Sequence, residues 1–222
     1  MKIPDNLSFE EAAAIPEAFL TAYQAIVWLG RLQPDETVLI HAGASGVGTA
    51  AIQIAREIGA GIFITAGSDH KTDFCLELGA DYAINYRNDS FSEIVRQKTA
   101  ARGTNLIIDF IGEPYWQSNL DSISLDGRIV VLATMGGSRL SEFDIRQLMR
   151  KRVTIMGSTL RNRSLNYKIK LTADFSDFAL PRLKDDSINP VVDKIFPWEE
   201  VAEAHRYMEE NRNIGKIVLK IS

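Results

Sequence analysis

The 222-residue sequence predicts an α/β fold: a doubly wound parallel sheet followed by a C-terminal appendage. Three observations predict it. Short runs rich in β-branched residues alternate with helical patterns from about residue 37 to residue 157. A glycine-rich turn, Gly43 to Gly48, joins the first run to an alanine-rich helical pattern. After about Arg163 the alternation ends, which sets off the remaining chain as an appendage.

The first 30 residues predict two entry helices. Ser8 and Glu11 have the spacing of a capping box, so a helix is expected over 8–15, and Pro16 should end it. Apolar residues at helical spacing predict a second helix over 17–29, with Gly30 as its C-cap. No apolar run in the sequence approaches the ~20 residues that a membrane span needs.

The next region, 31–163, carries the strand and helix alternation. Strands are expected near 37–41, 62–65, 82–85, 105–109, 128–132 and 153–157, and helices near 46–58, 69–78, 90–100, 114–123 and 142–150. Gly59, Gly79 and Gly103 lie near the ends of the first three helices, as left-handed caps would.

The last region, 164–222, has a different rhythm. It contains an amphipathic stretch over 164–180, the segment 188–192, an expected helix over 198–210 and a final strand at 216–219. We expect it to return toward a catalytic domain that this sequence does not contain.

Composition excludes some classes of function. The net charge of −4 argues against a nucleic-acid-binding surface, which needs a basic excess. The lone cysteine, Cys75, cannot form an internal disulfide, which favours a reducing compartment and predicts a soluble cytoplasmic protein. The expected partner is a small molecule, with no nucleic acid and no membrane.

The glycine turn predicts a dinucleotide site. Gly43 and Gly48 meet the G-x-G-x-x-G fingerprint of Rossmann domains, with Ser45 in the middle glycine slot. A strand before the turn and a helix after it would aim backbone amides and the positive helix end at a pyrophosphate. The alternatives are a tight turn without ligand and a nucleophile elbow, but Val47 occupies the last glycine slot of the latter.

The second strand bears on which dinucleotide binds. An NAD-preferring site has an acidic residue about 20 residues after the glycines, and here that slot holds Gly67. Ser68 and Lys71 are able to donate to a 2′-phosphate, so NADPH is the expected cofactor, with Asp69 as a local counterargument.

Several segments, in order along nearly the whole chain, resemble a known family. They are AAAIP (12–16), TAY (21–23), HAGASGVGTA (41–50), AGS (66–68), LGAD (78–81), NY (85–86) and GKIV (215–218). Together they resemble the zinc-independent medium-chain dehydrogenases/reductases, and within these the NADPH:quinone oxidoreductase branch.

The resemblance implies a set of cofactor-binding residues. It places Thr21 near the nicotinamide, Ser45, Gly46 and Val47 at the pyrophosphate, and other residues around the adenosine 2′-phosphate and along the nicotinamide side. The full set of expected cofactor-binding residues is Thr21, Gly43, Ser45, Gly46, Val47, Gly48, Gly67, Ser68, Lys71, Tyr86, Ile111, Met135, Gly136, Arg161 and Arg163.

The resemblance also implies an activity: hydride transfer from NADPH to a quinone or enone, with this chain as the cofactor-binding portion. The alternatives are a non-catalytic NADPH-binding module and an enoyl reductase. Family members begin with a barrel-like domain that forms the other wall of the cleft, and this sequence begins where that domain ends. The strand near 153–157 resembles the family's dimer edge, so a homodimer is expected.

No metal site and no catalytic acid or base is expected. Zinc-dependent relatives have a cysteine four positions before the nicotinamide threonine, and Glu17 stands there. The alternative is that Glu17 ligates a metal together with residues of the missing domain. The three histidines are far apart in the sequence and lack ligand spacing. His41 is expected to be a structural hydrogen-bonding residue, and Cys75 a core residue.

Overall fold

A computed structural model describes residues 1–141 and 143–221 of the chain. The strands are β1 (Thr37–Ile40), β2 (Gly61–Ala66), β3 (Tyr82–Asn85), β4 (Thr104–Asp109), β5 (Ile123–Val131), β6 (Thr154–Gly157), β7 (Val192–Pro197) and β8 (Lys216–Lys220). The helices are α1 (Phe9–Tyr23), α2 (Gly46–Ile58), α3 (Asp69–Leu78), α4 (Phe91–Lys98), α5 (Trp116–Ser122), α6 (Arg146–Lys151), α7 (Leu165–Lys184) and α8 (Val201–Glu209). Short helical turns lie at η1 (Gln24–Leu29), η2 (Glu113–Tyr115) and η3 (Trp198–Glu200).

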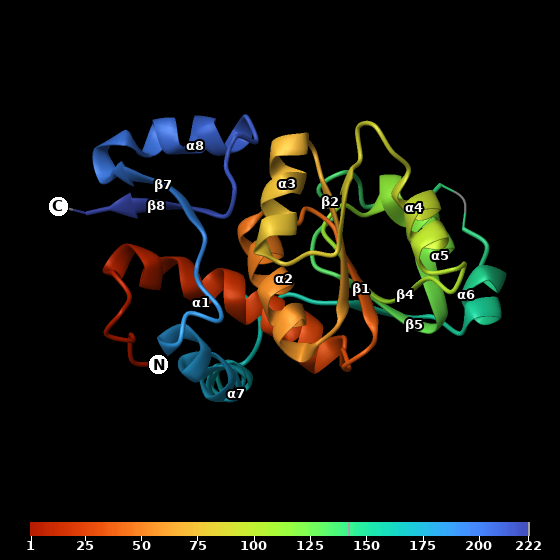
Figure 1. Ribbon diagram of the computed structural model, residues 1–222, viewed down its shortest axis with the longest axis horizontal. Helices are drawn as coiled ribbons and strands as arrows, with labels where there is room; N and C mark the ends of the chain where they lie inside the picture. The colour runs from red at the N-terminus through yellow and green to blue at the C-terminus, as the bar shows by residue number, and fades with distance from the viewer. Residues whose placement is uncertain (142, 222) are drawn as a thin grey trace.

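The fold class is confirmed. Six strands form a parallel sheet in the order β3-β2-β1-β4-β5-β6. Helices α1, α2 and α3 lie on one face of it, and α4 and α5 on the other (Figure 1). The chain therefore winds outward in both directions from β1, as in a Rossmann domain.

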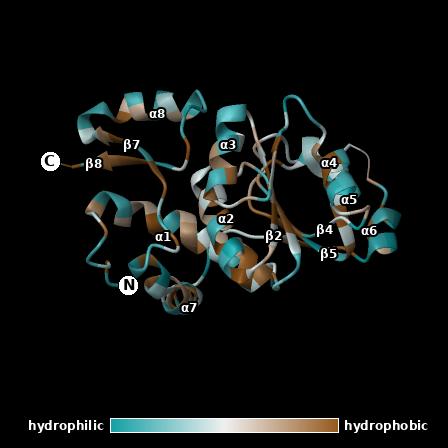
Figure 2. Ribbon diagram, in the orientation of Figure 1, coloured by the Kyte–Doolittle hydropathy of each residue, from teal (hydrophilic) through white to brown (hydrophobic). Residues whose placement is uncertain are grey.

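Strand β1 shows why these residues form a central strand. Val38, Leu39 and Ile40 are all fully buried. Val38 and Ile40 pack in the core on the α1 side, whereas Leu39 packs in the core on the α4 side. A parallel strand covered on both faces has a continuous apolar run instead of an alternating one. Figure 2 shows this hydrophobic colouring along the strands of the sheet.

The predicted stop at Pro16 is wrong. Helix α1 runs through Pro16, which is exposed, and continues directly into the π-helical turn η1. The combined helix, Phe9–Leu29, is 21 residues long and apolar enough to span a membrane by length and composition, so the expectation of no such run is also wrong. Half of its 18-residue apolar window is buried inside the protein, as in the core helix of a globular domain. The capping box of Ser8 and Glu11 is confirmed.

Other corrections concern element boundaries. Strand β5 begins at Ile123, where the last residue of a helix was expected, because Ile123 pairs with Thr104 before a register shift. Helix α6 begins only at Arg146, and residue 142, the predicted start, lies outside the described residues. Gly59 and Gly79 are left-handed caps as predicted. Gly103 is not a cap, because α4 ends at Lys98 with Thr99 as its C-cap.

The last region, 164–222, packs in two separate parts of the molecule. Helix α7 packs on α1, with Leu171, Phe175, Ala179 and Leu183 buried in the main core. Strands β7 and β8 form a separate parallel pair with α8 beside it, at the end of the molecule near the start of α1 (Figure 1).

Candidate functional site

The carboxyl ends of the six sheet strands meet at one edge of the molecule. In such sheets the ligand crevice lies outside that edge, at the point where the strand order reverses. Here the order reverses between β1 and β4, and the loop after β1 is the glycine turn. The sheet topology therefore places the predicted cofactor residues that follow the strands along a common edge.

The glycine turn is tightly packed against its neighbours. A Cβ atom on Gly43 would lie 2.7 Å from Cβ of Ile64 on β2, and one on Gly48 would collide with the carbonyl oxygen of Ala42. Ser45 is the N-cap of α2, and its hydroxyl accepts a hydrogen bond from the Gly48 amide at 3.0 Å. The turn thus fixes the start of α2, whose free amides and positive end suit an anion.

Lys216 lies directly over this turn, which sequence reasoning missed. A Cβ atom on Gly46 would collide with Cδ of Lys216. Gly215 holds the lysine there, because its amide donates to the Ala44 carbonyl oxygen at 2.8 Å. The Lys216 ammonium pairs with the Glu17 carboxylate at 2.9 Å. No spacing rule links positions so far apart in the sequence, so only the tertiary structure reveals this cation.

A second group of predicted residues meets at the ends of β2 and β3. The Tyr86 hydroxyl oxygen would lie 2.5 Å from a Cβ atom on Gly67, so the Tyr86 ring packs closely over this glycine. Ser68 is the N-cap of α3, and its side chain accepts a hydrogen bond from the Lys71 amide. Tyr86 remains 40% exposed, so this corner is open to solvent.

Lys71 lies in this corner but its ammonium is engaged elsewhere. Its Nζ donates to both the backbone oxygen and the side-chain oxygen of Asn211, at 2.7 and 2.9 Å. The lysine is only 8% exposed, and burial lowers its pKa from the ordinary value. To bind a ligand phosphate in this corner, the Lys71 ammonium has to break its hydrogen bonds to Asn211.

Three more predicted residues meet where the loops after β4 and β5 join. The Gly136 amide donates to the Ile111 carbonyl oxygen at 2.9 Å, and the Met135 amide donates to that of Phe110 at 3.0 Å. Asp109, which is fully buried, accepts from the Ile111 and Gly112 amides and so shapes the first loop. The Met135 side chain is 81% exposed at the edge.

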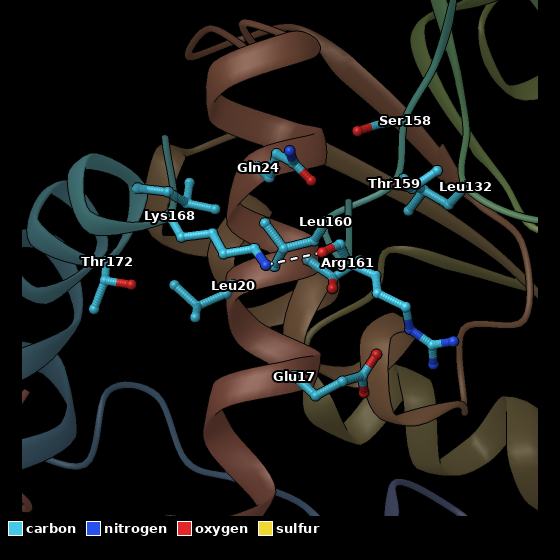
Figure 3. A pocket seen from close by; sticks show the side chains of 12 residues that line it. Glu17, Leu20, Gln24, Leu132, Ser158, Thr159, Leu160, Arg161, Lys168 and Thr172 are labelled. Carbon is cyan, nitrogen blue, oxygen red and sulfur yellow. Dashed lines mark hydrogen bonds between the residues drawn. The ribbon is translucent and has the colours of Figure 1, made fainter. Parts of the chain in front are cut away.

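A cleft of about 610 Å³ opens between α1, α7 and the segment after β6 (Figure 3). Thr21 and Arg161, both predicted, line it, as do Glu17 and Lys168. A neighbouring hollow of about 570 Å³ shares Leu132, Ser158 and Thr159 with the cleft and extends to Arg163. The two form one trough along the carboxyl ends of β5 and β6.

Two further residues of the trough were missed by sequence reasoning. Gln24 lines the cleft from one helical turn after Thr21, and Ser158 lies in both hollows. The side-chain oxygens of both are buried and have no hydrogen-bond partner among residues 1–141 and 143–221. A polar residue at helical spacing from Thr21 is the only sequence signal for Gln24.

The predictions for His41 and Cys75 are confirmed. The fully buried His41 donates through Nε2 to the Asn119 side-chain oxygen at 2.7 Å and accepts at Nδ1 from the Thr65 hydroxyl at 3.0 Å. Burial lowers the His41 pKa, which keeps the ring neutral. Cys75 is fully buried in the core, and burial raises the pKa of its thiol to about 12. Within the described part of the chain, no three His, Cys, Asp or Glu residues gather as metal ligands.

Comparison with known proteins shows two kinds of relative. A family model described as zinc-binding dehydrogenase matches residues 46–178. A highly reducing polyketide synthase of Emericella nidulans is 32% identical over 100% of this chain, which covers only 9% of that protein. Quinone oxidoreductase-like protein 2 of Bos taurus is 32% identical over 99% of this chain, which spans 63% of that protein.

Several solved structures match the fold of almost the whole chain. The quinone oxidoreductase of Thermus thermophilus, solved also with NADPH, has a TM-score of 0.87 at 31% identity, and 99% of this chain matches 69% of it. An NAD-dependent alcohol dehydrogenase has a TM-score of 0.87 at 35% identity, over 100% of this chain and 62% of that one. The CurK enoyl reductase has a TM-score of 0.85 at 32% identity, over 100% of this chain and 65% of that one.

Proposed function

The chain belongs to the zinc-independent medium-chain dehydrogenases/reductases, in their quinone oxidoreductase branch, and on that premise we propose that it forms the NADPH-binding portion of an oxidoreductase. The proposed reaction is hydride transfer from NADPH to a quinone or an enone. The observation that carries the proposal is the cradle at the glycine turn. There the Lys216 side chain lies against Gly46 at the start of α2, so a cation adjoins the positive end of a helix, a combination that suits a pyrophosphate.

The chain's own residues would bind and orient the cofactor. The amides at the start of α2 would receive the pyrophosphate, and the corner of Gly67, Ser68 and Tyr86 would receive the adenosine end. The trough lined by Thr21 would hold the nicotinamide and exclude water on its inner side. The cofactor, when bound, supplies the hydride, so the protein's contribution is position and electrostatics.

The choice between NADPH and NADH depends on the corner formed by Gly67, Ser68 and Tyr86. The absence of a carboxylate at Gly67 removes the usual partner of a ribose 2′-hydroxyl, and Ser68 and Lys71 offer donors to a 2′-phosphate. NADH is the competing cofactor, because an NAD-dependent alcohol dehydrogenase is among the similar structures.

Titration of the purified chain with NADPH and with NADH, followed by nicotinamide fluorescence, tests the proposal. We expect tighter binding of NADPH, and in Lys71→Ala an NADPH affinity that falls to that for NADH. Lys71→Ala should leave NADH affinity nearly unchanged, because NADH lacks the phosphate. Failure of the wild-type chain to bind either dinucleotide would refute the proposal.

The enoyl reductase alternative is favoured by a specific observation: the CurK enoyl reductase matches this chain as completely as the quinone oxidoreductase does. Turnover of a small quinone against a 2-enoyl thioester separates the two activities. Cofactor binding without turnover of either acceptor supports the third alternative, a non-catalytic NADPH-binding module, for this chain by itself.

A further inference from the structure

The floor of the cleft holds a side-chain amide with a fixed orientation. Gln24 is 1% exposed, and its Nε2 donates to the Tyr167 hydroxyl at 2.8 Å. Tyr167 is itself held between the Trp28 ring, whose centroid is 5.0 Å away, and the Arg163 guanidinium, 4.7 Å from its ring. One N–H of Gln24 is committed to Tyr167, and its carbonyl oxygen is the atom that lacks a partner among the residues the structure describes.

The amide lies at an irregular point of the backbone. Gln24 is the first residue of the π-helical turn η1, where the helix widens, and such single turns within α-helices occur frequently at functional sites. Figure 3 shows Gln24 on the same helix as Glu17 and Leu20, on the side facing the segment that carries Ser158 and Leu160.

Two buried oxygens at this floor lack partners in the protein. Neither the Gln24 Oε1 nor the Ser158 Oγ has a hydrogen-bond partner among the residues that the structure describes. Ser158 is 8% exposed, and its amide donates to the Val131 carbonyl oxygen at 3.0 Å, which fixes the segment. Buried polar atoms without partners are rare and destabilising, so a pair of them lining one cleft points to a ligand.

The chemistry of the two oxygens selects the ligand group. The Gln24 carbonyl can only accept a hydrogen bond, whereas the Ser158 hydroxyl can also donate one. A quinone or an enone carbonyl only accepts, so neither satisfies Gln24. A primary carboxamide offers an N–H to Gln24 and a C=O to Ser158, and the nicotinamide of NADPH carries such a group.

We infer that Gln24 and Ser158 form a carboxamide receptor that sets the orientation of the nicotinamide ring, with Tyr167 as the residue that holds Gln24 in place. This inference rests on the proposed function, because NADPH supplies the carboxamide. Gln24 and Tyr167 are positioning residues for the ring, and neither takes part in hydride transfer.

The test compares NADP⁺ with its 3-acetylpyridine analogue, in which a methyl group replaces the carboxamide NH₂. Calorimetric titration of the wild-type chain should show NADP⁺ binding about tenfold more tightly, as one net hydrogen bond to a buried acceptor implies. In Gln24→Met, which removes the acceptor at similar volume, the preference should largely disappear. Tyr167→Phe, which frees the amide to rotate, should reduce it partly.

Thr172→Val is the matched control, because it removes a hydroxyl from the same cleft without touching the two unpartnered oxygens. It should keep the wild-type preference. If Gln24→Met fails to fold, Tyr167→Phe carries the test, and a full wild-type preference retained in that variant would overturn the inference. Ser158→Ala should weaken NADP⁺ and the analogue alike, because both keep the carbonyl oxygen.

The failures are distinguishable. A wild-type chain that binds NADP⁺ and its analogue equally means that Gln24 faces only water, which overturns the inference and leaves the proposed function standing. A full preference retained in folded Gln24→Met has the same meaning. A wild-type chain that binds neither dinucleotide overturns the proposed function and the inference together.

Discussion

At the scale of single residues, the candidate site contains two cations that already have partners. Lys216 pairs with Glu17 at 2.9 Å, and Lys71 donates to Asn211. Both lie beside the proposed positions of phosphates, so cofactor binding would exchange one set of partners for another. The sequence predicted Lys71, which follows β2 by a few residues. It did not predict Lys216, because the contact depends on how β8 docks on the glycine turn.

Lys216→Met should weaken NADPH and NADH binding equally, by about ten- to a hundred-fold, as the loss of a charged contact of about 1.5–3 kcal/mol implies. Titration by nicotinamide fluorescence measures both. Lys220→Met, which removes a cation paired with Glu10 from the same strand, is the control and should leave both affinities nearly unchanged. Selective loss of NADPH binding alone in Lys216→Met would place this lysine at the 2′-phosphate instead.

Cys75 gives a prediction about pH. Burial raises the pKa of its thiol from 9.0 to about 12, so the folded protein keeps a proton that the unfolded chain loses between these values. Because the folded state binds more protons in that window, the Cys75 contribution to the free energy of unfolding falls as pH rises above about 9.

Urea unfolding at pH values of about 8 and about 10 checks this prediction, with Cys75→Ala as the comparison. The variant should lose less stability than the wild type between the two pH values. At mildly alkaline pH a thiol reagent should modify Cys75 only in the unfolded chain, and rapid modification of the native protein would contradict the burial.

At the scale of elements, the strands were easier to predict than the helix boundaries. A continuous apolar run such as Val38 to Ile40 predicts a central strand, because a strand covered on both faces buries every side chain. Proline chemistry predicted a break at Pro16, but the packing of Ile15, Phe19 and Tyr23 in the main core keeps the helix continuous. Register shifts such as the one in β5 arise from pairing between distant residues, which no local pattern encodes.

Pro16→Ala should stabilise the protein. Pro16 lies in the interior of α1 and exposes its side chain, so alanine restores a helix hydrogen bond without disturbing the core. The free energy of unfolding should rise by about 1–3 kcal/mol, less the effect of a more flexible unfolded chain. Urea denaturation measures it. Ser8→Ala, which removes the N-cap of the same helix, should lower stability by about 1 kcal/mol.

At the scale of the whole molecule, the order of elements and the glycine turn predicted the sheet and its parallel strands. The trough at the ends of β5 and β6 could not be predicted, because it requires α1 and α7 to meet the segment after β6. Its polar floor could not be predicted either, since Gln24 meets Tyr167 from a position 143 residues away.

The open edge of the sheet predicts an assembly. Strand β6 lies at the end of the strand order, and the expected homodimer would pair two such edges. The Ser158 amide points to β5, and amides alternate along a strand, so the Ile155 amide points outward.

Analytical ultracentrifugation should therefore find a particle of twice the 24.7 kDa chain mass. Ile155→Pro should shift it to a monomer without breaking a bond to β5, whereas Ile155→Val should leave the dimer intact. A dimer that survives Ile155→Pro must use another surface.

The Glu17 carboxylate competes with the proposed pyrophosphate for the Lys216 ammonium. Only molecules in which Lys216 has left Glu17 can pair this ammonium with the pyrophosphate. The apparent dissociation constant of the dinucleotide therefore equals its intrinsic dissociation constant divided by the fraction of such molecules. Added salt then acts twice, since it screens the ligand's charge and also releases the lysine from Glu17. Dinucleotide affinity should consequently depend less on ionic strength than the charge of the ligand suggests, and Glu17→Gln should both tighten binding and restore the steeper dependence.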